Sequence, residues 1–550
     1  MDEQANKNEY NDQNKKIKQH IISVASCIGR KTIKYLGILL SLILVVMLGY
    51  ITIQFVHLKL WIGNEQIVVK ELTKNQKEED FTYLAKFVEE VYPFSEELQK
   101  VKGIPNLSEL SSDYIRRAGE THNNEEYLLL FLEYTERLRQ AGHGGIQFPD
   151  YSLFTSYTFD IPKDAFYKGE YWQSLLSNIQ YYAHSELDIM YQDGHYYVIA
   201  NNAAPKLNIE VGAIVEAVNG VPVDEWVKRL EAEQPLIYDN YHNKVYTQHL
   251  FMRDPGKDIK GWEVSFKHKD GTVSQLFLDK LSGYKEDINA FFKQSHVYCT
   301  NLQDSVGYIY IPNFFMENIN QDGQSISEFM SSNSVRLNKL IIDIRGNQGG
   351  EETYWLNNII RPLIGNETEL HSKTAVKKGF ISRMNLRLAY YRATATNHLL
   401  HPKSHYVSSV STTTDPSIDS DIWKVYDITQ KLSPTNSFNF NGKIIVLMDT
   451  NSISAADSFA SAMKQLGLAT LAGNPSGGWG NHYISPVLFA LPNSGLCFRS
   501  DVELSYNVDG RPTSIYGTMP DVFLKQHPYP SELTKEALLS DEWISWAVDY

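Results

Sequence analysis

A long apolar stretch near the start of the chain, residues 35–56, contains no charged side chain. A helix rises about 1.5 Å per residue, so about 20 residues cross the hydrocarbon layer of a bilayer. A cleaved secretory signal has a shorter apolar run, of about 7–15 residues, and small residues at its cleavage site. Residues 57–61, His-Leu-Lys-Leu-Trp, offer no such site. The pattern therefore predicts an uncleaved transmembrane helix over residues 35–56, preceded by a tail of residues 1–34.

Basic residues on the two sides of this stretch predict its orientation, because Lys and Arg collect on the cytoplasmic side. Six of them lie within the 20 residues before the stretch, and three lie over the same distance after it. The sequence therefore predicts a single-pass protein of the cell membrane, with a cytoplasmic N-terminus and everything from about residue 64 onward outside the cytoplasm. The six are Lys15, Lys16, Lys18, Arg30, Lys31 and Lys34, and the three are Lys59, Lys70 and Lys74.

Beyond the apolar stretch, apolar residues recur at three- and four-residue steps over residues 80–101 and 107–119, which predicts two helices. A stronger helical pattern starts at Asn124, the expected N-cap, and has acidic residues in its first turn. It ends where glycines enter the sequence, in Ala-Gly-His-Gly-Gly at 141–145. We expect residues 64–150 to form a small helical domain.

The pattern then changes from helical to extended over residues 186–280. Residues 262–268 alternate between apolar and polar side chains, as a half-buried strand does. Asn219-Gly220 and Asp270-Gly271 are typical of tight turns between strands. A β-rich domain is therefore predicted. Its expected strands cover residues 196–200, 211–218, 262–268 and 274–278, with a helix from Asp224.

From Val306 onward, short apolar strands alternate with helices, which indicates an α/β domain over residues 300–545. Between them, residues 364–438 are long, polar and rich in Ser and Thr. Loops of that length are usually functional or mobile, so we expect a loop there that could serve as a lid. The predicted strands are 306–311, 340–344 and 443–448, and the predicted helices are 352–360 and 455–466.

Composition narrows the possible functions. The formal net charge of −14 argues against a general nucleic-acid binder, which needs a basic surface. Three cysteines are too few for a disulfide framework or a zinc site built from cysteines. His401 and His405 are four residues apart, but no third ligand lies near them and the HExxH motif is absent, so no metal site is expected. No cofactor is expected either.

Ser454 is the first candidate for chemistry, because it stands between the predicted strand that ends at Met448 and the predicted helix that begins at Ala455. A hydroxyl at this junction faces the free N–H groups and the positive dipole end of a helix, which stabilise developing negative charge. A nucleophile elbow has this geometry, although the GxSxG motif is absent. The alternative is an ordinary N-cap serine.

Two glycine-rich segments accompany the serine. Residues 343–350 read Asp-Ile-Arg-Gly-Asn-Gln-Gly-Gly and follow a strand, so Gly349 and Gly350 could direct N–H groups toward an oxyanion, or could form a plain turn. Residues 473–480 read Gly-Asn-Pro-Ser-Gly-Gly-Trp-Gly and lack the Lys-Ser/Thr ending of a phosphate-binding loop. They could shape the edge of a substrate site or form a turn. A Gly-Thr-Met-Pro-Asp sequence follows at 517–521.

In this order, the segments resemble the tail-specific, or C-terminal processing, serine peptidases and their relatives in the tricorn protease core. Those enzymes have DLRGNPGG, a serine motif at a helix start, a glycine loop and a final GxxPD. Residues 211–223 are similar to the PDZ domain that these enzymes carry, and the whole resemblance covers residues 125–525. It implies a crotonase-like α/β catalytic domain and a PDZ-like domain at 186–280.

The resemblance also implies roles for single residues. Ser454 corresponds to the nucleophile, and the oxyanion donors correspond to the N–H groups of Gly349 or Gly350 and of Ala455. The lysine base of the bacterial enzymes falls on Trp479, which excludes a Ser-Lys dyad. The tricorn branch uses a histidine instead, and His143 resembles it.

Two further positions bear on this assignment. His482 is an alternative base, because it lies near the serine in the sequence. The family places an acidic residue just before GxxPD, where this chain has Thr513 and Ser514, so the third member of the triad is missing from its expected position.

The sequence thus predicts a membrane-anchored, extracytoplasmic serine peptidase that cleaves peptide bonds through an acyl-enzyme, without a cofactor. Its expected partners are peptide or protein substrates and the membrane, and the oligomeric state stays open. The PDZ-like domain is expected to bind a C-terminal carboxylate or an extended peptide by strand addition. The alternatives are a catalytically inactive peptide-binding protein on the same scaffold and a hydrolase of non-peptide esters.

Overall fold

The structure is a computed structural model that divides into two units, Met1–Val69 and Lys70–Tyr550. It describes five residues between 41 and 49 and most residues from 69 to 550, and its longer gaps are 103–105, 140–142, 147–162, 180–184, 202–206, 233–235, 252–259, 281–293, 380–406 and 526–528. Most of the predicted transmembrane stretch, residues 35–56, and the histidines at 401 and 405 lie outside the described residues. Within the described residues, no helix is long and apolar enough to cross a membrane.

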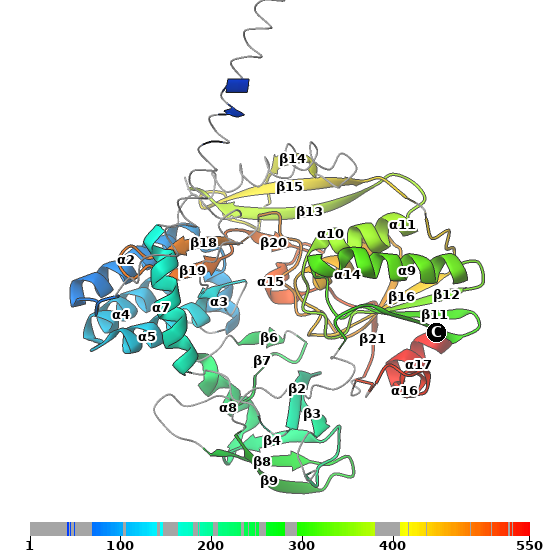
Figure 1. Cartoon of the computed structure of the whole chain (residues 1–550), viewed down its shortest axis with the longest axis horizontal. Helices are drawn as coiled ribbons and strands as arrows, with labels where there is room; N and C mark the ends of the chain where they lie inside the picture. Colours follow the sequence, from blue (N-terminus) through cyan, green and yellow to red (C-terminus); the bar gives the residue numbers. More distant parts are fainter. Residues whose placement is uncertain are drawn as a thin grey trace, which may run out of the picture. The chain divides into compact units, whose positions relative to one another are not determined.

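Four helices open the second unit (Figure 1). The predicted single helix over 80–101 is wrong, because the chain forms two helices with a break at Pro93. Proline has no N–H to donate and disfavours helical backbone at the residue before it, here Tyr92. The first helix starts at a capping box between Thr73 and Gln76. The helices are α2 (Lys74–Val91), α3 (Ser95–Lys102), α4 (Leu107–Glu120) and α5 (Asn124–Arg139).

The start of α5 differs from the prediction by one residue. Asn123, not Asn124, caps the helix, because its Oδ1 accepts a hydrogen bond from the Glu126 N–H at 2.8 Å. The Asn124 side chain instead accepts from the Leu72 N–H at 3.0 Å and donates to the Tyr171 hydroxyl at 3.1 Å. It therefore ties α5 to neighbouring segments rather than capping the helix.

The helices share a hydrophobic core with strands from near the C-terminal end of the chain. The rings of Phe87 in α2 and Phe489 in β18 (Val487–Ala490) lie 3.5 Å apart between centroids. The indole of Trp172, in α7 (Lys163–Ile179), donates a hydrogen bond to the Ser494 carbonyl at 2.9 Å. The proposed boundary of a helical domain at residue 150 stays a prediction, but the core of these helices extends to residues 484–506.

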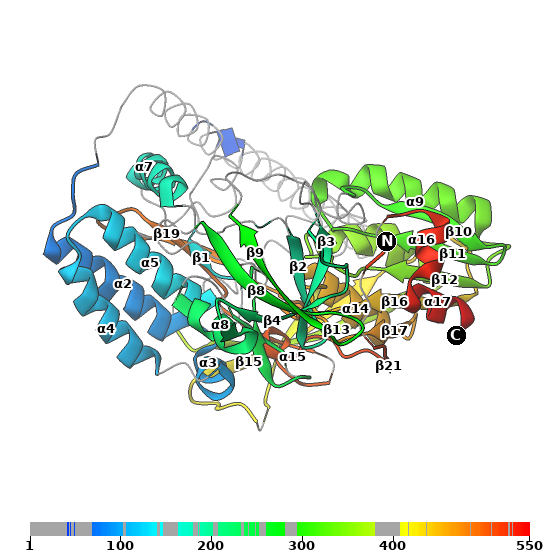
Figure 2. The same ribbon diagram turned by 90° about the horizontal axis from the view of Figure 1, so that it is seen from below.

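The predicted β-rich region contains a mainly antiparallel sheet (Figure 2). Asn219 and Gly220 both have positive φ, 49° and 74°, which is the backbone that a tight hairpin turn requires. The strand order is β2-β3-β4-β8-β9, with β5 paired to β4. The elements are β2 (Leu187–Gln192), β3 (His195–Asn201), β4 (Ile214–Val218), β5 (Val221–Pro222), α8 (Val223–Arg229), β8 (Gly261–Lys267) and β9 (Val273–Asp279), with a separate hairpin of β6 (Ile237–Asp239) and β7 (Lys244–Tyr246).

The predicted α/β domain contains a six-stranded sheet of order β10-β11-β12-β16-β17-β21, whose five strands from β11 to β21 are parallel. All three predicted strands of this domain are confirmed to within one residue at each end. The strands are β10 (Tyr298–Gln303), β11 (Val306–Tyr310), β12 (Lys339–Asp343), β16 (Lys443–Met448), β17 (Thr470–Gly473) and β21 (Val522–Phe523).

Helices cover both faces of this sheet, which explains why its strands are apolar throughout (Figure 1). Ile342 of β12 faces a core that contains residues of α9 and α14, and its neighbour Ile341 faces a core that contains residues of α17. The helices are α9 (Ile319–Asn333), α10 (Glu352–Trp355) with a π-helical continuation (Leu356–Ile360), α11 (Arg361–Leu363), α14 (Ala455–Gln465), α16 (Lys535–Ser540) and α17 (Glu542–Asp549).

The prediction of one long loop over residues 364–438 is wrong. The segment supplies three strands of an antiparallel sheet of order β14-β15-β13-β20. Its strands contain many polar and threonine residues, because part of the sheet faces solvent while residues such as Ala375 and Val425 reach the core. Residues 380–406 lie outside the described part. The strands are β13 (Thr368–Lys377), β14 (Val407–Thr413), β15 (Trp423–Leu432) and β20 (Leu504–Tyr506).

Candidate active site

Ser454 stands between β16 and α14, as the sequence predicted. Its φ is +57°, a value that residues other than glycine seldom adopt, and its side chain caps no N–H of α14. The ordinary N-cap reading is therefore wrong. Such strained backbone is found where a fold must hold one side chain in a fixed place, as in a nucleophile elbow. The hydroxyl Oγ lies 3.0 Å from His143 Nε2.

His143 reaches the serine from a position 311 residues earlier in the chain. It lies between α5 and the short strand β1 (Gly145–Ile146), two residues before β1 begins, and β1 pairs with β19 (Cys497–Ser500). The register places Gly145 opposite Arg499, and the backbone N–H of His143 donates a 2.6 Å hydrogen bond to Asp501 Oδ2. The pairing of β1 with β19 therefore fixes the imidazole beside Ser454.

Asp501 supplies the carboxylate that sequence reasoning missed. Its Oδ1 lies 3.6 Å from His143 Nδ1, on the side of the ring opposite Ser454, and its side chain is fully buried. The position where the related peptidases place their acidic residue lies instead in α15 (Thr513–Tyr516), and Thr513 donates to the Gly480 carbonyl. Nothing in the local sequence marks Asp501, because only the pairing of β1 with β19 brings it to His143.

Burial and neighbouring charges shift the pKa values of His143 and Asp501 in opposite directions. Burial lowers the pKa of His143 below its usual value, and the Asp501 carboxylate only partly opposes this. Burial also disfavours the charged form of Asp501, but His482 and His143 outweigh it and keep the pKa of Asp501 below its usual value. The site therefore holds a neutral imidazole next to an ionised carboxylate near neutral pH.

His482 lies beside the pair rather than on the serine. Its ring centroid is 5.1 Å from that of His143, and its Nδ1 is 3.4 Å from Glu503 Oε1. Although burial acts in the other direction, Asp501 and Glu503 raise the pKa of His482 to about 9. Within the described residues, the histidine nitrogen bonded to Ser454 Oγ is Nε2 of His143. The geometry therefore favours His143 over His482 as the base.

The two predicted oxyanion glycines differ in their surroundings. The Gly349 N–H donates a hydrogen bond to Asn347 Oδ1 at 2.8 Å, so it is not available to an oxyanion. A Cβ on Gly349 would lie 2.8 Å from Ser454 Cβ and 2.9 Å from the Ala455 nitrogen, too close for any side chain. Gly350 and Ala455 both line the cleft that contains Ser454. Gly349 thus allows the close approach of the two loops, and Gly350 and Ala455 are the predicted donors that line the cleft.

Trp479, which occupies the position of the family lysine, packs against His143. Its ring centroid lies 5.8 Å from that of His143, and only 7% of the residue is exposed. An indole N–H can donate but cannot accept a proton. Trp479 therefore covers part of the imidazole and cannot itself accept a proton.

The glycine loop at 473–480 packs against the nucleophile loop rather than forming an isolated turn. The Gly478 carbonyl accepts a hydrogen bond from the Ser454 N–H at 2.8 Å. The buried carboxylate of Asp457, in the first turn of α14, accepts from Ser476 Oγ at 2.6 Å and from the Gly480 N–H at 3.0 Å. These contacts fix the backbone on both sides of Ser454.

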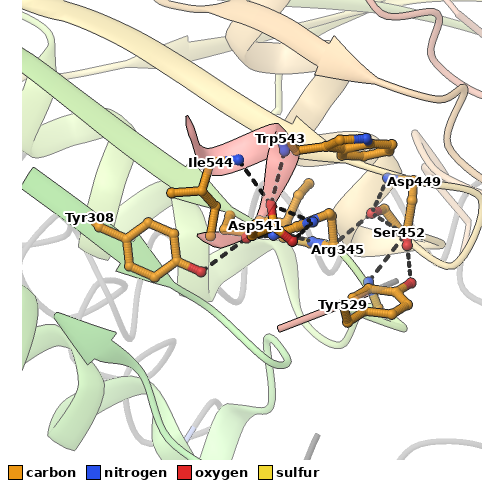
Figure 3. Close-up of polar contacts among 11 residues, drawn as sticks. Tyr308, Arg345, Asp449, Ser452, Tyr529, Asp541, Trp543 and Ile544 are labelled. Carbon is orange, nitrogen blue, oxygen red and sulfur yellow. Dashed lines mark hydrogen bonds and ion pairs between the residues drawn. The ribbon is translucent and has the colours of Figure 1, made fainter. Parts of the chain in front are cut away.

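A buried charge cluster centres on Arg345, which follows β12 in the chain (Figure 3). The Arg345 guanidinium pairs with Asp343 at 2.7 Å and with Asp541 at 3.1 Å, and Asp541 also accepts hydrogen bonds from the first N–H groups of α17. Next to it, Ser452 Oγ donates to the Ile344 carbonyl at 2.8 Å. The Gly346 N–H donates to Asp449. The strand-end loops are therefore bonded to each other and, through Arg345, to the C-terminal helix.

A cleft of about 430 Å³ opens in front of the serine. His143, Ser454 and Trp479 lie in its wall, together with residues of the sheet that the sequence had suggested was a loop. Leu370 of β13 and Ile428 of β15 give that wall an apolar part. The cleft therefore combines an apolar surface for a side chain with the polar groups of the site.

A serine at a strained strand-to-helix junction, a histidine bonded to its hydroxyl and a buried carboxylate behind the histidine together form the constellation of a serine hydrolase. Residues 305–524 match the family model for peptidase family S41. This part of the chain is accordingly a peptidase family S41 domain, which confirms the family predicted from the sequence motifs, and the protein is a serine peptidase. The match does not include His143, which lies outside those residues.

Two solved structures share the fold of this chain, and a third is similar to it at a lower score. The structure of mature CPAF complexed with lactacystin has a TM-score of 0.56 and 14% identity, and the match covers 86% of this chain and 97% of that one. The structure of mature CPAF has a TM-score of 0.56 and 15% identity, with 86% and 96% covered. The photosystem II D1 C-terminal processing protease has a TM-score of 0.42, 14% identity and coverage of 85% and 98%. No curated protein sequence matches the chain.

Proposed function

We propose that this peptidase cleaves peptide or protein substrates through an acyl-enzyme on Ser454, with His143 as the general base and Asp501 as the acid that orients it. The observation that carries the proposal is the 3.0 Å contact between Ser454 Oγ and His143 Nε2, with Asp501 on the far side of the same ring. Both catalytic side chains lie in the wall of one cleft, where a substrate carbonyl could approach them.

The proposed reaction uses these groups in turn. Ser454 Oγ attacks the scissile carbonyl carbon while His143 Nε2 takes its proton. The N–H groups of Gly350 and Ala455 stabilise the resulting oxyanion, and Gly349 keeps them close to the serine. The C–N bond then breaks as His143 returns the proton to the leaving amine. Water, activated by the same imidazole, releases the acyl group and restores the serine.

Asp501 supports this reaction by its charge. A carboxylate at this place favours the tautomer of His143 that carries its proton on Nδ1, so that Nε2 is free to accept. It also stabilises the imidazolium that forms in the transition state. Although Asp501 stands 12 positions before the place of the family's acidic residue, its contact with His143 allows it to take over the same role.

The inactive peptide-binding protein remains the contrasting hypothesis, and labelling by a fluorophosphonate probe separates the two, because only an activated serine reacts. We expect labelling of the full chain and none of the Ser454→Ala variant. We also expect His143→Ala to lose most of the labelling. An unlabelled full chain that still binds peptides would establish the binder. Turnover of a peptide library against a panel of small esters then distinguishes a peptidase from an esterase.

We further propose that the catalytic part is outside the cytoplasm and anchored by residues 35–56. The support is the length of this uncharged stretch and the excess of basic residues before it. Protease added to intact cells should then digest residues beyond about 64 and leave a protected N-terminal fragment. If the full-length chain is digested only after detergent is added, the orientation is wrong.

The region 186–280 is proposed to be a PDZ-like substrate-binding domain. Its sheet has β2 and β9 as edge strands, and an edge strand can add an extended peptide through main-chain hydrogen bonds. A peptide bound at such an edge would add affinity rather than chemistry. Deletion of this region should therefore reduce the cleavage of long peptides and leave fluorophosphonate labelling in place. Equal loss of both would mean that the region helps to build the active site.

A further inference from the structure

Several buried polar atoms near the catalytic serine have no hydrogen-bond partner among the described residues, and His143 Nδ1, His482 Nε2 and Asp501 Oδ1 are among them. The three residues can offer one ligand atom each, with all of these atoms within 4.8 Å of one another. Two of these atoms, His143 Nδ1 and Asp501 Oδ1, face each other at 3.6 Å, and the His482 ring lies beside that of His143. Because an unpaired buried polar atom is costly, a cation bound by all three side chains would be stabilised there.

The other polar atoms of these three side chains each have a polar contact. Asp501 Oδ2 accepts from the His143 backbone N–H at 2.6 Å. His482 Nδ1 lies 3.4 Å from Glu503 Oε1, and His143 Nε2 lies 3.0 Å from Ser454 Oγ. A histidine that binds a metal typically donates its second ring N–H to a carboxylate, which orients the ring. His482 with Glu503 has this arrangement.

We propose that His143, His482 and Asp501 form a binding site for a zinc ion, and that zinc bound there switches the peptidase off. Two imidazoles and one carboxylate suit zinc, which binds nitrogen and oxygen ligands in tetrahedral geometry and can take water as its fourth ligand. The zinc–nitrogen bond of about 2.0–2.1 Å places neighbouring ligand atoms roughly 3.3 Å apart. His143 Nδ1 and Asp501 Oδ1 are already 3.6 Å apart, so side-chain rotations would complete the site.

The charges around the site also favour a cation. The carboxylates of Asp501, Glu503 and Glu352 interact electrostatically with His482, and the nearby guanidinium of Arg499 acts on His143 in the opposite direction. Zinc must displace the proton that His482 carries near neutral pH, and the buried carboxylates of Asp501 and Glu503 then face the cation.

The inhibition follows from the proposed role of His143, and this part of the inference rests on the proposed function. Zinc takes the lone pair of Nδ1, so the ring proton must sit on Nε2, the atom that faces Ser454 Oγ. The imidazole then donates toward the hydroxyl and cannot accept its proton. No bond is broken and nothing is oxidised, so removal of the zinc restores the active tautomer.

Zinc binding can be tested without any peptidase activity, on the full chain with Ser454→Ala. This variant keeps all three ligands and cannot cleave itself. We expect calorimetric titration with Zn²⁺ to show one site per chain and Co²⁺ to give the visible absorption of a tetrahedral site. His482→Gln in the same background should weaken binding at least tenfold, and so should Asp501→Asn. His371→Gln is the matched control, because His371 lines the same cleft without belonging to the cluster, and it should bind as the parent does.

Inhibition is measured in the chain that retains Ser454. Buffered free Zn²⁺ should abolish peptide turnover and a chelator should restore it, and His482→Gln should need at least tenfold more zinc relative to its own metal-free rate. If zinc does not bind, or binds equally well without His482 and without Asp501, the site is overturned and the proposed function stands. If zinc binds but turnover is unaffected, the switch is overturned. If the unmodified chain never reacts with fluorophosphonate, the proposed function fails while the binding result stands.

Discussion

Replacement of Asp501 by Asn tests the proposed triad most directly, because it removes one negative charge and changes little in shape. The amide oxygen can still accept the 2.6 Å hydrogen bond from the His143 backbone N–H, so the loop should keep its position. What is lost is the attraction between the carboxylate and the imidazolium that forms in the transition state. Asn can also present its NH₂ group to Nδ1, which favours the wrong tautomer of His143.

The size of the effect follows from the distance. Asp501 Oδ1 and His143 Nδ1 are 3.6 Å apart, longer than a hydrogen bond, so the interaction is mainly Coulombic. At an effective dielectric constant of about 20, two unit charges at this distance attract by about 4–5 kcal/mol. Since about 1.4 kcal/mol is a factor of ten in rate, kcat should fall by about a thousandfold.

The assay is steady-state cleavage of a peptide substrate, together with the rate of fluorophosphonate labelling. Asp501→Asn should lower kcat far more than it changes KM, because the carboxylate stabilises charge that exists only in the transition state. The control is Asp509→Asn, which removes a partly exposed carboxylate paired with Arg511 and should leave kcat unchanged. If a folded Asp501→Asn variant retains kcat within tenfold of the parent, the carboxylate does not act on the base, and the reasoning is refuted.

Four other outcomes can be checked. Ser454→Ala and His143→Ala should each lower peptide turnover by at least a thousandfold, and the double variant should be little worse than either, because the two act as one unit; additive losses in the double variant would contradict this. Activity should rise with pH through a step below about 6.5, because burial lowers the pKa of His143 and only its neutral form accepts a proton. A step well above 7 in the pH–rate profile would be inconsistent with His143 as the base. Asp541→Asn should lower the melting temperature, because Arg345 is buried and removal of one partner of a buried ion pair costs about 3–5 kcal/mol. An unchanged melting temperature would mean that the pair contributes nothing to stability. Gly349→Ala should lower kcat at least tenfold while the chain stays folded, because its Cβ would lie 2.8 Å from Ser454 Cβ, and a fully active variant would show that the loops need not approach so closely.

The strands and the serine of the catalytic domain could be predicted because their signals are local. The apolar runs of β11, β12 and β16 are typical of strands covered on both faces, and Ser454 stands directly between a strand and a helix. The π-helical turn after α10 falls inside the predicted helix 352–360, so the type of element was right although its geometry was not. The helix α9 was not predicted, because its sequence has many polar residues and a glycine at 323.

The acidic residue could not be predicted in the same way. His143 and Asp501 are 358 residues apart, and they meet only because the two-residue strand β1 pairs with β19. A strand so short has no periodicity to detect. At the position where the family has its acidic residue, this chain has Thr513, which donates a hydrogen bond to the Gly480 carbonyl. The resemblance therefore did not point to Asp501.

The sheet within residues 364–438 was missed for a physical reason of another kind. Several of its polar positions are exposed, and the solvent-facing residues of an antiparallel sheet need not be apolar. Ser and Thr in such strands resemble the composition of a loop. The threonines of β13 and β14 were the available signal, since β-branched residues favour strands.

The pairing of β1 with β19 also determines the stage of synthesis at which His143 and Ser454 can come together. Synthesis proceeds from the N-terminus, so the histidine at 143 is made first, the serine 311 residues later, and the strand that seats the histidine later still. A chain interrupted before residue 497 carries both reactive side chains but lacks the partner that brings them together. On the proposed mechanism, peptidase activity requires the pairing of β1 with β19, and we expect a chain that stops before residue 497 to be inactive.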